Sequence, residues 1–155
     1  MEIAPIPMES LAELLALQMD SGGIARLVVT GSSMHPTLRH RKDAVFLRPV
    51  ERGLKRGDII LYRRKNGRFV LHRIISNPKG DIFFCSGDNQ WQKERVTISQ
   101  VLAVTDGFIR NRKKVREDDP GYRLWVNTWL FLFPLRRPIL ALRRFWGRIR
   151  SRIKR

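Results

Sequence analysis

A series of short runs rich in β-branched and aromatic residues, separated by turn signals, occupies residues 24–110. The runs recur roughly every 8–15 residues, and no convincing helical pattern lies between them. Antiparallel strands can be joined by short hairpins, whereas parallel strands need long crossovers. The sequence therefore predicts a mainly β, antiparallel fold rather than βαβ units. In chain order the runs are ARLVVT, AVFLRPV, DIILYRR, RFVLHRII, DIFFCS and QVLAVTDGFIR.

Turn signals separate several of these runs. Asn66-Gly67 stands between two of them, as in a tight hairpin turn. Residues 77–80 (Asn-Pro-Lys-Gly) mark the next turn, and the basic segment 111–114 (Asn-Arg-Lys-Lys) is typical of a turn or hairpin tip. Cys85 is the single cysteine, so no internal disulfide is possible. It follows an apolar run and is predicted to be a small buried side chain.

The chain divides into three regions by composition. Residues 9–20 (ESLAELLALQMD) have Leu11, Leu14, Leu15 and Met19 on one helical face and precede Gly22-Gly23, which predicts a short N-terminal helix. We therefore expect residues 1–22 to form this helical segment, 23–116 a β domain, and 117–155 a linker followed by a basic tail. A chain of 155 residues suits one domain.

The tail begins with a predicted linker, residues 117–121, and continues through an aromatic segment (LWVNTWLFLF) and Pro134. Beyond Pro134, apolar residues spaced by three and four predict an amphipathic helix. Its apolar face comprises Leu135, Ile139, Leu142, Trp146, Ile149 and Ile153. Arginines are expected mostly on the remaining surface: Arg136, Arg137, Arg143, Arg144, Arg148 and Arg152.

The net charge of +17 attracts polyanions, meaning an anionic membrane or a nucleic acid. A helix with tryptophan and aliphatic residues on one side and arginine on the other is typical of a bilayer interface, so we expect residues 123–155 to contact an anionic membrane. The aromatic segment adds a shallow insertion, while Arg136 and Arg137 oppose a full span. Two alternatives remain: a helix packed on its own β domain, or nucleic-acid binding by the tail.

The N-terminus does not resemble a secretory signal, because Glu2, Glu9 and Glu13 precede the first basic residue, Arg26. No stretch approaches the ~18 consecutive apolar residues of a spanning helix. We therefore expect a cytoplasmic protein, or one bound peripherally to the cytoplasmic face of a membrane.

Four short segments carry the candidate chemistry, in a fixed order. A serine needs a base to become a useful nucleophile at neutral pH, and histidine is suited to that role. Ser33 at a strand-to-turn junction and His72 within a strand have the required chemistry, although each segment alone is commonly structural. The segments are Gly31–Leu38 (GSSMHPTL), Arg56–Ile60 (RGDII), Val70–Ile75 (VLHRII) and Ser86–Asn89 (SGDN).

Together these segments resemble the boxes of the type I signal peptidases, over roughly residues 27–105. The resemblance is to the histidine-base type found in endoplasmic-reticulum and archaeal members, without the family's N-terminal membrane anchor. It implies an all-β catalytic domain that hydrolyses peptide bonds through an acyl-enzyme, with Ser33 as nucleophile and His72 as general base. The carboxylate that orients His72 is left open between Asp88 and Glu94. Gly31 stands where the family often has a serine that assists the oxyanion, which leaves backbone N–H groups for that task.

The resulting hypothesis is a serine endopeptidase of the signal-peptidase type that cleaves a precursor or leader peptide. One alternative is a self-cleaving regulator, similar in its peptidase domain to the SOS repressors. Another is an inactive peptidase fold that binds anionic lipid or nucleic acid. His35 is interpreted as a surface residue. No cofactor or metal is expected, because the sequence has neither metal-ligand spacing nor a glycine-rich phosphate loop.

Overall fold

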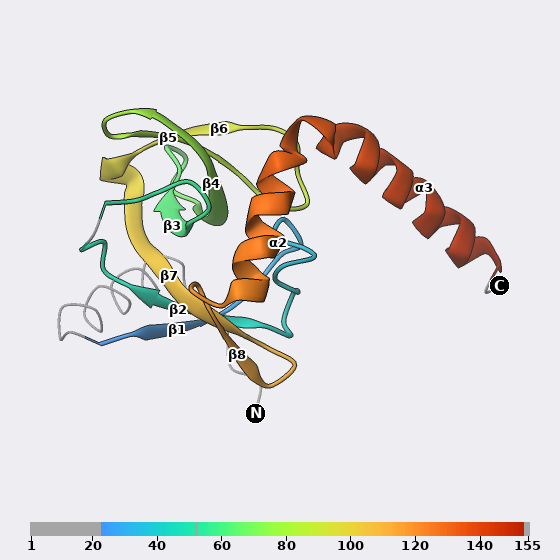
Figure 1. The fold of residues 1–155 in the computed structure, drawn as a ribbon, viewed down its shortest axis with the longest axis horizontal. Helices are drawn as coiled ribbons and strands as arrows, with labels where there is room; N and C mark the ends of the chain where they lie inside the picture. Colours follow the sequence, from blue (N-terminus) through green and yellow to red (C-terminus); the bar gives the residue numbers. More distant parts are fainter. Residues whose placement is uncertain (1–22, 52, 154–155) are drawn as a thin grey trace.

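The computed structural model describes residues 23–51 and 53–153. The helix predicted over residues 9–20 lies outside these residues. The described part is built on one eight-stranded antiparallel sheet, in the order β1-β2-β7-β3-β4-β5-β6 with β8 paired to β7 (Figure 1). The predicted mainly β, antiparallel fold is confirmed. The strands are β1 Ala25–Val28, β2 Ala44–Arg48, β3 Ile59–Arg63, β4 Phe69–Lys79, β5 Ile82–Ser86, β6 Glu94–Thr97, β7 Val101–Arg110 and β8 Lys113–Arg116.

Hairpins join the strands where the turn signals predict them, with one shift. Asn66-Gly67 closes the β3–β4 hairpin, where Gly67 adopts a φ of 83° that favours glycine. The turn expected at residues 77–80 lies later, because β4 continues through bulges to Lys79 and the chain reverses at Gly80. Asn111 and Arg112 form the tip between β7 and β8, so the predicted hairpin is present.

The two faces of the central strand β3 supply two different apolar cores. Successive side chains of a strand point to opposite faces. Ile59 and Leu61 accordingly pack in one buried cluster, with the β1 and β2 residues, while Ile60 and Tyr62 pack in the other. Cys85 belongs to the second cluster and is fully buried, as predicted. Burial raises the pKa of its thiol to about 12, which keeps it protonated.

Helix α2 (Pro120–Phe131) follows β8 and lies along the sheet (Figure 1). The linker expected over residues 117–121 is therefore shorter than predicted, because Pro120 occupies the first turn of the helix, a position that proline favours. Val126 and Leu130 are buried in a cluster with Ile75 of β4. Part of the aromatic segment thus packs against the β domain.

The short helix η2 (Phe133–Leu135) connects α2 to α3 (Arg136–Ile153), which extends away from the sheet (Figure 1). Within the described residues, neither helix combines the length and the apolar character that crossing a bilayer requires. The sequence placed Arg136 on the polar surface of the tail, and this prediction is wrong: the residue is fully buried. Its guanidinium lies 4.7 Å from the ring centres of both Trp129 and Phe133 and close to a buried carboxylate, Asp88.

Candidate active site

The loop between β1 and β2 carries Ser33, and we call residues 31–38 the Ser33 loop. Met34 and Leu38 anchor it in the first apolar core, with 2% and 0% exposure. The loop begins at Gly31, which adopts a φ of 86° and donates its backbone N–H to His40 Nδ1 at 2.8 Å. Because residues on both sides of it are fixed by burial and by the backbone conformation of Gly31, Ser33 is held in place while the residue stays partly exposed.

A second loop, residues 87–89 directly after β5, holds the Ser33 loop in place. The backbone N–H of Asn89 donates to the Ser33 carbonyl at 2.7 Å, and the Asn89 side-chain amide donates to the Ser32 carbonyl at 3.2 Å. Gly87 packs so closely on Ser33 that a Cβ at this position would overlap the Ser33 carbonyl oxygen. The glycine of this segment is therefore required for space, and the asparagine fixes the orientation of the peptide groups around Ser33.

His72 lies in the middle of β4, opposite Ile60 of β3, and is 3% exposed. Its Nδ1 lies 3.2 Å from the Tyr62 hydroxyl, which in turn donates to Glu94 Oε2 at 2.8 Å. Arg64 donates to both oxygens of Glu94, with the shortest contact at 2.7 Å. Three side chains from β3, β6 and the β3–β4 hairpin thus form a chain of polar contacts behind the imidazole.

The protonation states of these groups follow from the contacts. Burial raises the pKa of Glu94, but the hydrogen bonds from Arg64 and Tyr62 outweigh this effect and hold it below its usual range. Burial and the neighbouring carboxylate raise the pKa of Tyr62, which stays protonated. Tyr62 donates its single hydroxyl proton in the hydrogen bond to the ionised Glu94, so its oxygen accepts a hydrogen bond from His72 Nδ1–H. This tautomer leaves His72 Nε2 as an acceptor.

Ser33 and His72 line one cavity of about 200 Å³, together with Leu71, Arg64 and Gln90. The hydrogen bonds of the described residues do not include a direct one between Ser33 Oγ and the His72 ring. Hydrogen bonds of this kind often tighten only when substrate is bound. Burial lowers the pKa of His72 to about 4, with the negative charge of Glu94 acting in the opposite direction. The imidazole is therefore neutral at neutral pH.

Asp88 has different surroundings from Glu94. Its two oxygens accept from Arg73 at 2.9 and 2.7 Å, and one of them also accepts from Thr37 Oγ1 at 2.5 Å. Arg136 lies 3.8 Å away, and neither side chain of the Arg73–Asp88 ion pair is exposed. Burial alone would lower the pKa of Arg73, but the charge of Asp88 and its hydrogen bonds raise it. Asp88 is thus the centre of a buried ionic cluster beneath the Ser33 loop.

Helix α2 supports this cluster through two indole groups. Trp125 donates to Thr37 Oγ1 at 3.0 Å, and Trp129 donates to the Asp88 carbonyl at 3.2 Å. The two indoles stack with their centres 5.3 Å apart. The Tyr122 hydroxyl contacts the Arg73 guanidinium at 3.1 Å. Residues from the predicted tail therefore help to position the Ser33 loop.

Sequence reasoning missed Tyr62 as a site residue, although a signal for it was present. The Asn66-Gly67 turn sets the register of β3 against β4, pairing Tyr62 with Val70 and Ile60 with His72. Diagonal neighbours on one face of an antiparallel pair are within reach of long side chains. The hairpin register therefore places the Tyr62 hydroxyl beside the His72 ring.

His35, expected at the surface, is half-buried, and its Nδ1 lies 2.6 Å from Arg143 Nη2.

Within residues 23–51 and 53–153, no group of three or more His, Cys, Asp or Glu side chains is placed to hold a metal ion.

No curated protein matches the chain in sequence. The Peptidase S24-like family matches residues 8–106, which cover most of the chain and include the Ser33 loop, β4 and the loop after β5. This match agrees with the signal-peptidase-like serine peptidase fold that the four segments suggest. The chain belongs to the Peptidase S24-like family.

Proposed function

We propose that this protein is a serine endopeptidase in which Ser33 is the nucleophile and His72 the general base. The observation that carries the proposal is the shared cavity of Ser33 and His72, with His72 Nδ1 held by the Tyr62 hydroxyl, which in turn donates to Glu94. A serine beside a base that is itself oriented by a third group is the arrangement that activates a hydroxyl. Glu94, acting through Tyr62, is therefore the better candidate than Asp88 for the orienting carboxylate.

The reaction follows from this arrangement. His72 Nε2 accepts the proton of Ser33 Oγ while Oγ forms a bond to the scissile carbonyl carbon. Backbone N–H groups of the Ser33 loop, chiefly that of Ser33, stabilise the resulting oxyanion. The imidazolium then gives its proton to the leaving amine as the C–N bond breaks, which leaves an acyl-enzyme on Ser33. Water, deprotonated by His72, releases the acyl group.

The substrate class follows from the resemblance and the cavity. Signal-peptidase-like enzymes take an extended peptide along a strand edge, with small residues before the scissile bond. The cavity beside Ser33 is small, about 200 Å³, and is lined by Val29, Leu71 and Gln90 among others. A precursor or leader peptide with a small residue at the cleavage site fits these dimensions.

A peptide-library assay with matched variants tests the proposal. The wild type should cleave peptides with small residues before the cut, and Ser33→Ala and His72→Ala should both lose this activity. Ser32→Ala is the control, because it removes a hydroxyl one residue away and leaves the Ser32 carbonyl that binds Asn89. Equal cleavage by the wild type and both active-site variants would remove the proposed mechanism.

Self-cleavage is a second candidate, favoured by the match to the Peptidase S24-like family. The same Ser33 and His72 would act on a peptide bond of their own chain. Incubating the purified protein at raised pH and measuring its mass distinguishes the two functions. Fragments from the wild type but not from Ser33→Ala support self-cleavage, whereas an intact chain that still cuts library peptides excludes it.

A further inference from the structure

The first two turns of α3 determine which side of this helix faces the β domain. Arg136 donates to the carbonyls of Gly87 and Trp129 at 3.2 and 3.3 Å and is fully buried. Leu140, one turn later, is 2% exposed. Arg143, another turn along, contacts His35 of the Ser33 loop at 2.6 Å. Residues 136, 140 and 143 share one side of a helix, and this side is the one occupied by the protein itself.

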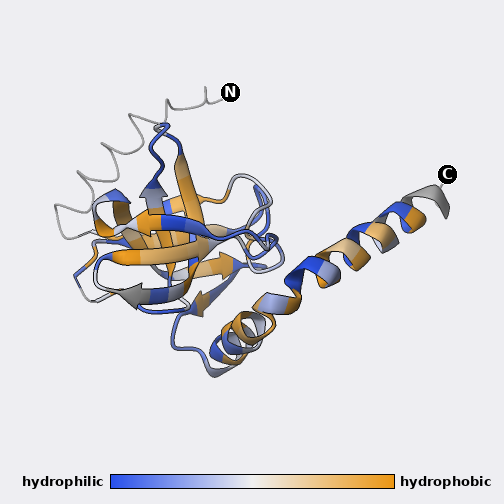
Figure 2. Cartoon of the chain, turned by 90° about the horizontal axis from the view of Figure 1, so that it is seen from above, coloured by the Kyte–Doolittle hydropathy of each residue, from blue (hydrophilic) through white to orange (hydrophobic). Residues whose placement is uncertain are grey.

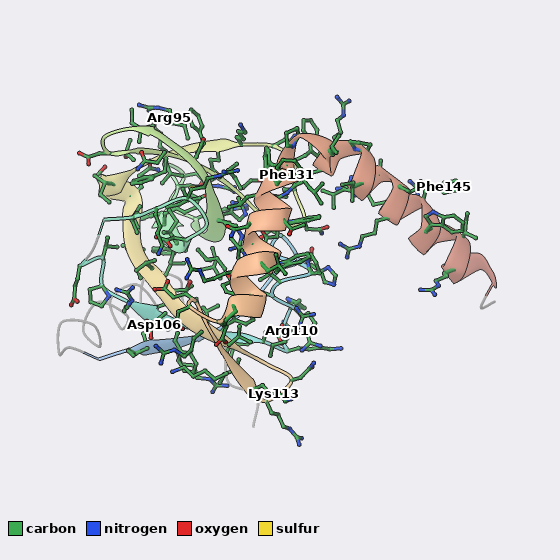
Figure 3. The ribbon with its side chains drawn as sticks, in the orientation of Figure 1. Arg95, Asp106, Arg110, Lys113, Phe131 and Phe145 are labelled. Carbon is green, nitrogen blue, oxygen red and sulfur yellow. The ribbon has the colours of Figure 1, made fainter. Side chains whose placement is uncertain are left out.

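The apolar stripe of α3 points in a different direction. At about 100° per residue, Leu142, Phe145 and Trp146 lie roughly 120° around the helix from the anchored side. These three side chains are 58%, 55% and 58% exposed. Figure 2 shows α3 extending from the domain with hydrophobic and hydrophilic residues in alternating bands, and Figure 3 shows Phe145 on the part of α3 distant from the sheet. The described β domain therefore leaves this stripe uncovered.

The charges on the same helix are all of one sign. The sequence of α3, RRPILALRRFWGRIRSRI, contains seven arginines and no acidic residue. The last acidic residue of the whole chain is Asp119, before α2 begins. An exposed apolar stripe flanked by cations alone complements a surface that offers apolar depth and negative charge together.

We propose that α3 binds the surface of an anionic membrane, lying in the interface plane with Leu142, Phe145 and Trp146 inserted. The arginines beside the stripe then meet lipid phosphates. A bilayer fits better than a nucleic acid, because the aromatic rings are grouped with aliphatic side chains instead of being spaced among cations as stacking platforms. Since Arg143 contacts His35, the bound helix holds the Ser33 loop close to the headgroups.

Vesicle flotation of the full chain tests this proposal, using phosphatidylcholine vesicles with and without phosphatidylglycerol. Trp146→Glu and Leu142→Glu each place a carboxylate in the stripe. Gly147→Glu is the matched control: it makes the same charge change, and nothing lies within 4 Å of a Cβ at this position, which is on another side of the helix. Thermal unfolding of each variant confirms that the β domain remains folded.

The wild type should float with the phosphatidylglycerol vesicles and not with pure phosphatidylcholine. Each stripe variant should lose at least about tenfold in affinity, while Gly147→Glu should change it by about twofold or less. Equal effects at positions 146 and 147, or no flotation of the wild type, would overturn the proposal. Binding of a short DNA duplex in place of vesicles would assign the helix to nucleic acid. Flotation needs no peptidase activity, so its outcome is separate from that of the Ser33 assays.

Discussion

The Tyr62 hydroxyl lies between His72 Nδ1, at 3.2 Å, and Glu94 Oε2, at 2.8 Å. Since a phenol has one proton and Glu94 is ionised, the tyrosine accepts from the imidazole and donates to the carboxylate. The hydroxyl thereby transmits the orienting effect of Glu94 to a histidine that the carboxylate does not touch directly. Tyr62 is a positioning residue in the proposed reaction, because it acts through His72.

Tyr62→Phe should slow peptide cleavage without unfolding the protein. The substitution leaves the buried His72 Nδ1–H without an acceptor, which costs about 1–3 kcal/mol and corresponds to a rate loss of roughly five- to 150-fold. The check is kcat/KM, measured together with the ¹⁵N shifts of the His72 ring. The wild type should show the Nδ1–H tautomer, and the variant should show a mixture. An unchanged tautomer together with an unchanged rate would contradict the role given to Tyr62.

The pH dependence of cleavage should reflect the buried environment of His72. Burial lowers its pKa from 6.5 to about 4, so the neutral base persists well below neutral pH. The acidic limb of kcat/KM should therefore have its midpoint near pH 4 in the free enzyme. A midpoint near pH 6.5 would show that the functioning imidazole is solvated.

The same shift predicts how folding stability changes with pH. A histidine whose pKa is lower in the folded state binds fewer protons folded than unfolded, so stability falls as pH decreases from about 6.5 to about 4. The loss attributable to His72 is on the order of 3 kcal/mol, at about 1.4 kcal/mol per pKa unit. Urea unfolding of the wild type and His72→Gln at several pH values measures it. The free energy of unfolding of the wild type, relative to that of His72→Gln, should fall as the pH decreases and should level off below pH 4.

Replacing the two carboxylates near the site should have different effects. The change at Asp88 should mainly lower the stability of the protein, and the change at Glu94 should mainly lower its activity. Asp88→Asn leaves Arg73 and Arg136 buried without their counter-charge, which should lower the free energy of unfolding by about 3–5 kcal/mol. The Glu94 side chain is 31% exposed, so Glu94→Gln should change stability by about 1 kcal/mol or less. Glu94→Gln should nevertheless reduce cleavage, because a neutral amide orients Tyr62 less strongly.

Urea unfolding and library cleavage of both variants check this assignment. Asp88→Asn also perturbs the hydrogen bond that Asp88 accepts from Thr37, so Thr37→Val serves as the control for that contact. If Asp88→Asn kept full stability and abolished cleavage, the orienting role would pass to Asp88.

The strands β3 and β4 and their pairing could be predicted because their signals are local. Runs rich in β-branched and aromatic residues mark β3 and β4, and the Asn66-Gly67 turn fixes how these strands pair. β6 gave no such signal: its sequence, ERVT, buries one side chain, Val96. The contact of Glu94 with Tyr62 depends on the pairing of β6 with β5, and the β6 sequence alone does not predict that pairing.

The buried position of Arg136 shows a different limit of the sequence. Helical periodicity assigns an arginine to the polar side of α3, since the pattern weighs only the residues of that helix. Asp88 and the carbonyl of Gly87, both on the loop after β5, provide the charge and the acceptor that draw Arg136 inward. Burial lowers the pKa of Arg136 to about 10 in spite of Asp88, which leaves it cationic at neutral pH. A contact between distant segments thus outweighs the local pattern.

Gly87→Ala should impair both folding and catalysis, because a Cβ at residue 87 overlaps the Ser33 carbonyl oxygen. Relieving that overlap requires the Ser33 loop to move, with a cost of about 1–3 kcal/mol in the free energy of unfolding. A displacement of about 1 Å at the nucleophile costs on the order of a hundredfold in rate. Gly121→Ala is the matched control, since nothing lies within 4 Å of a Cβ there and Gly121 is in α2. Urea unfolding and kcat/KM of both variants give the comparison. If Gly87→Ala cleaved peptides as fast as Gly121→Ala, the loop after β5 would not be what positions Ser33.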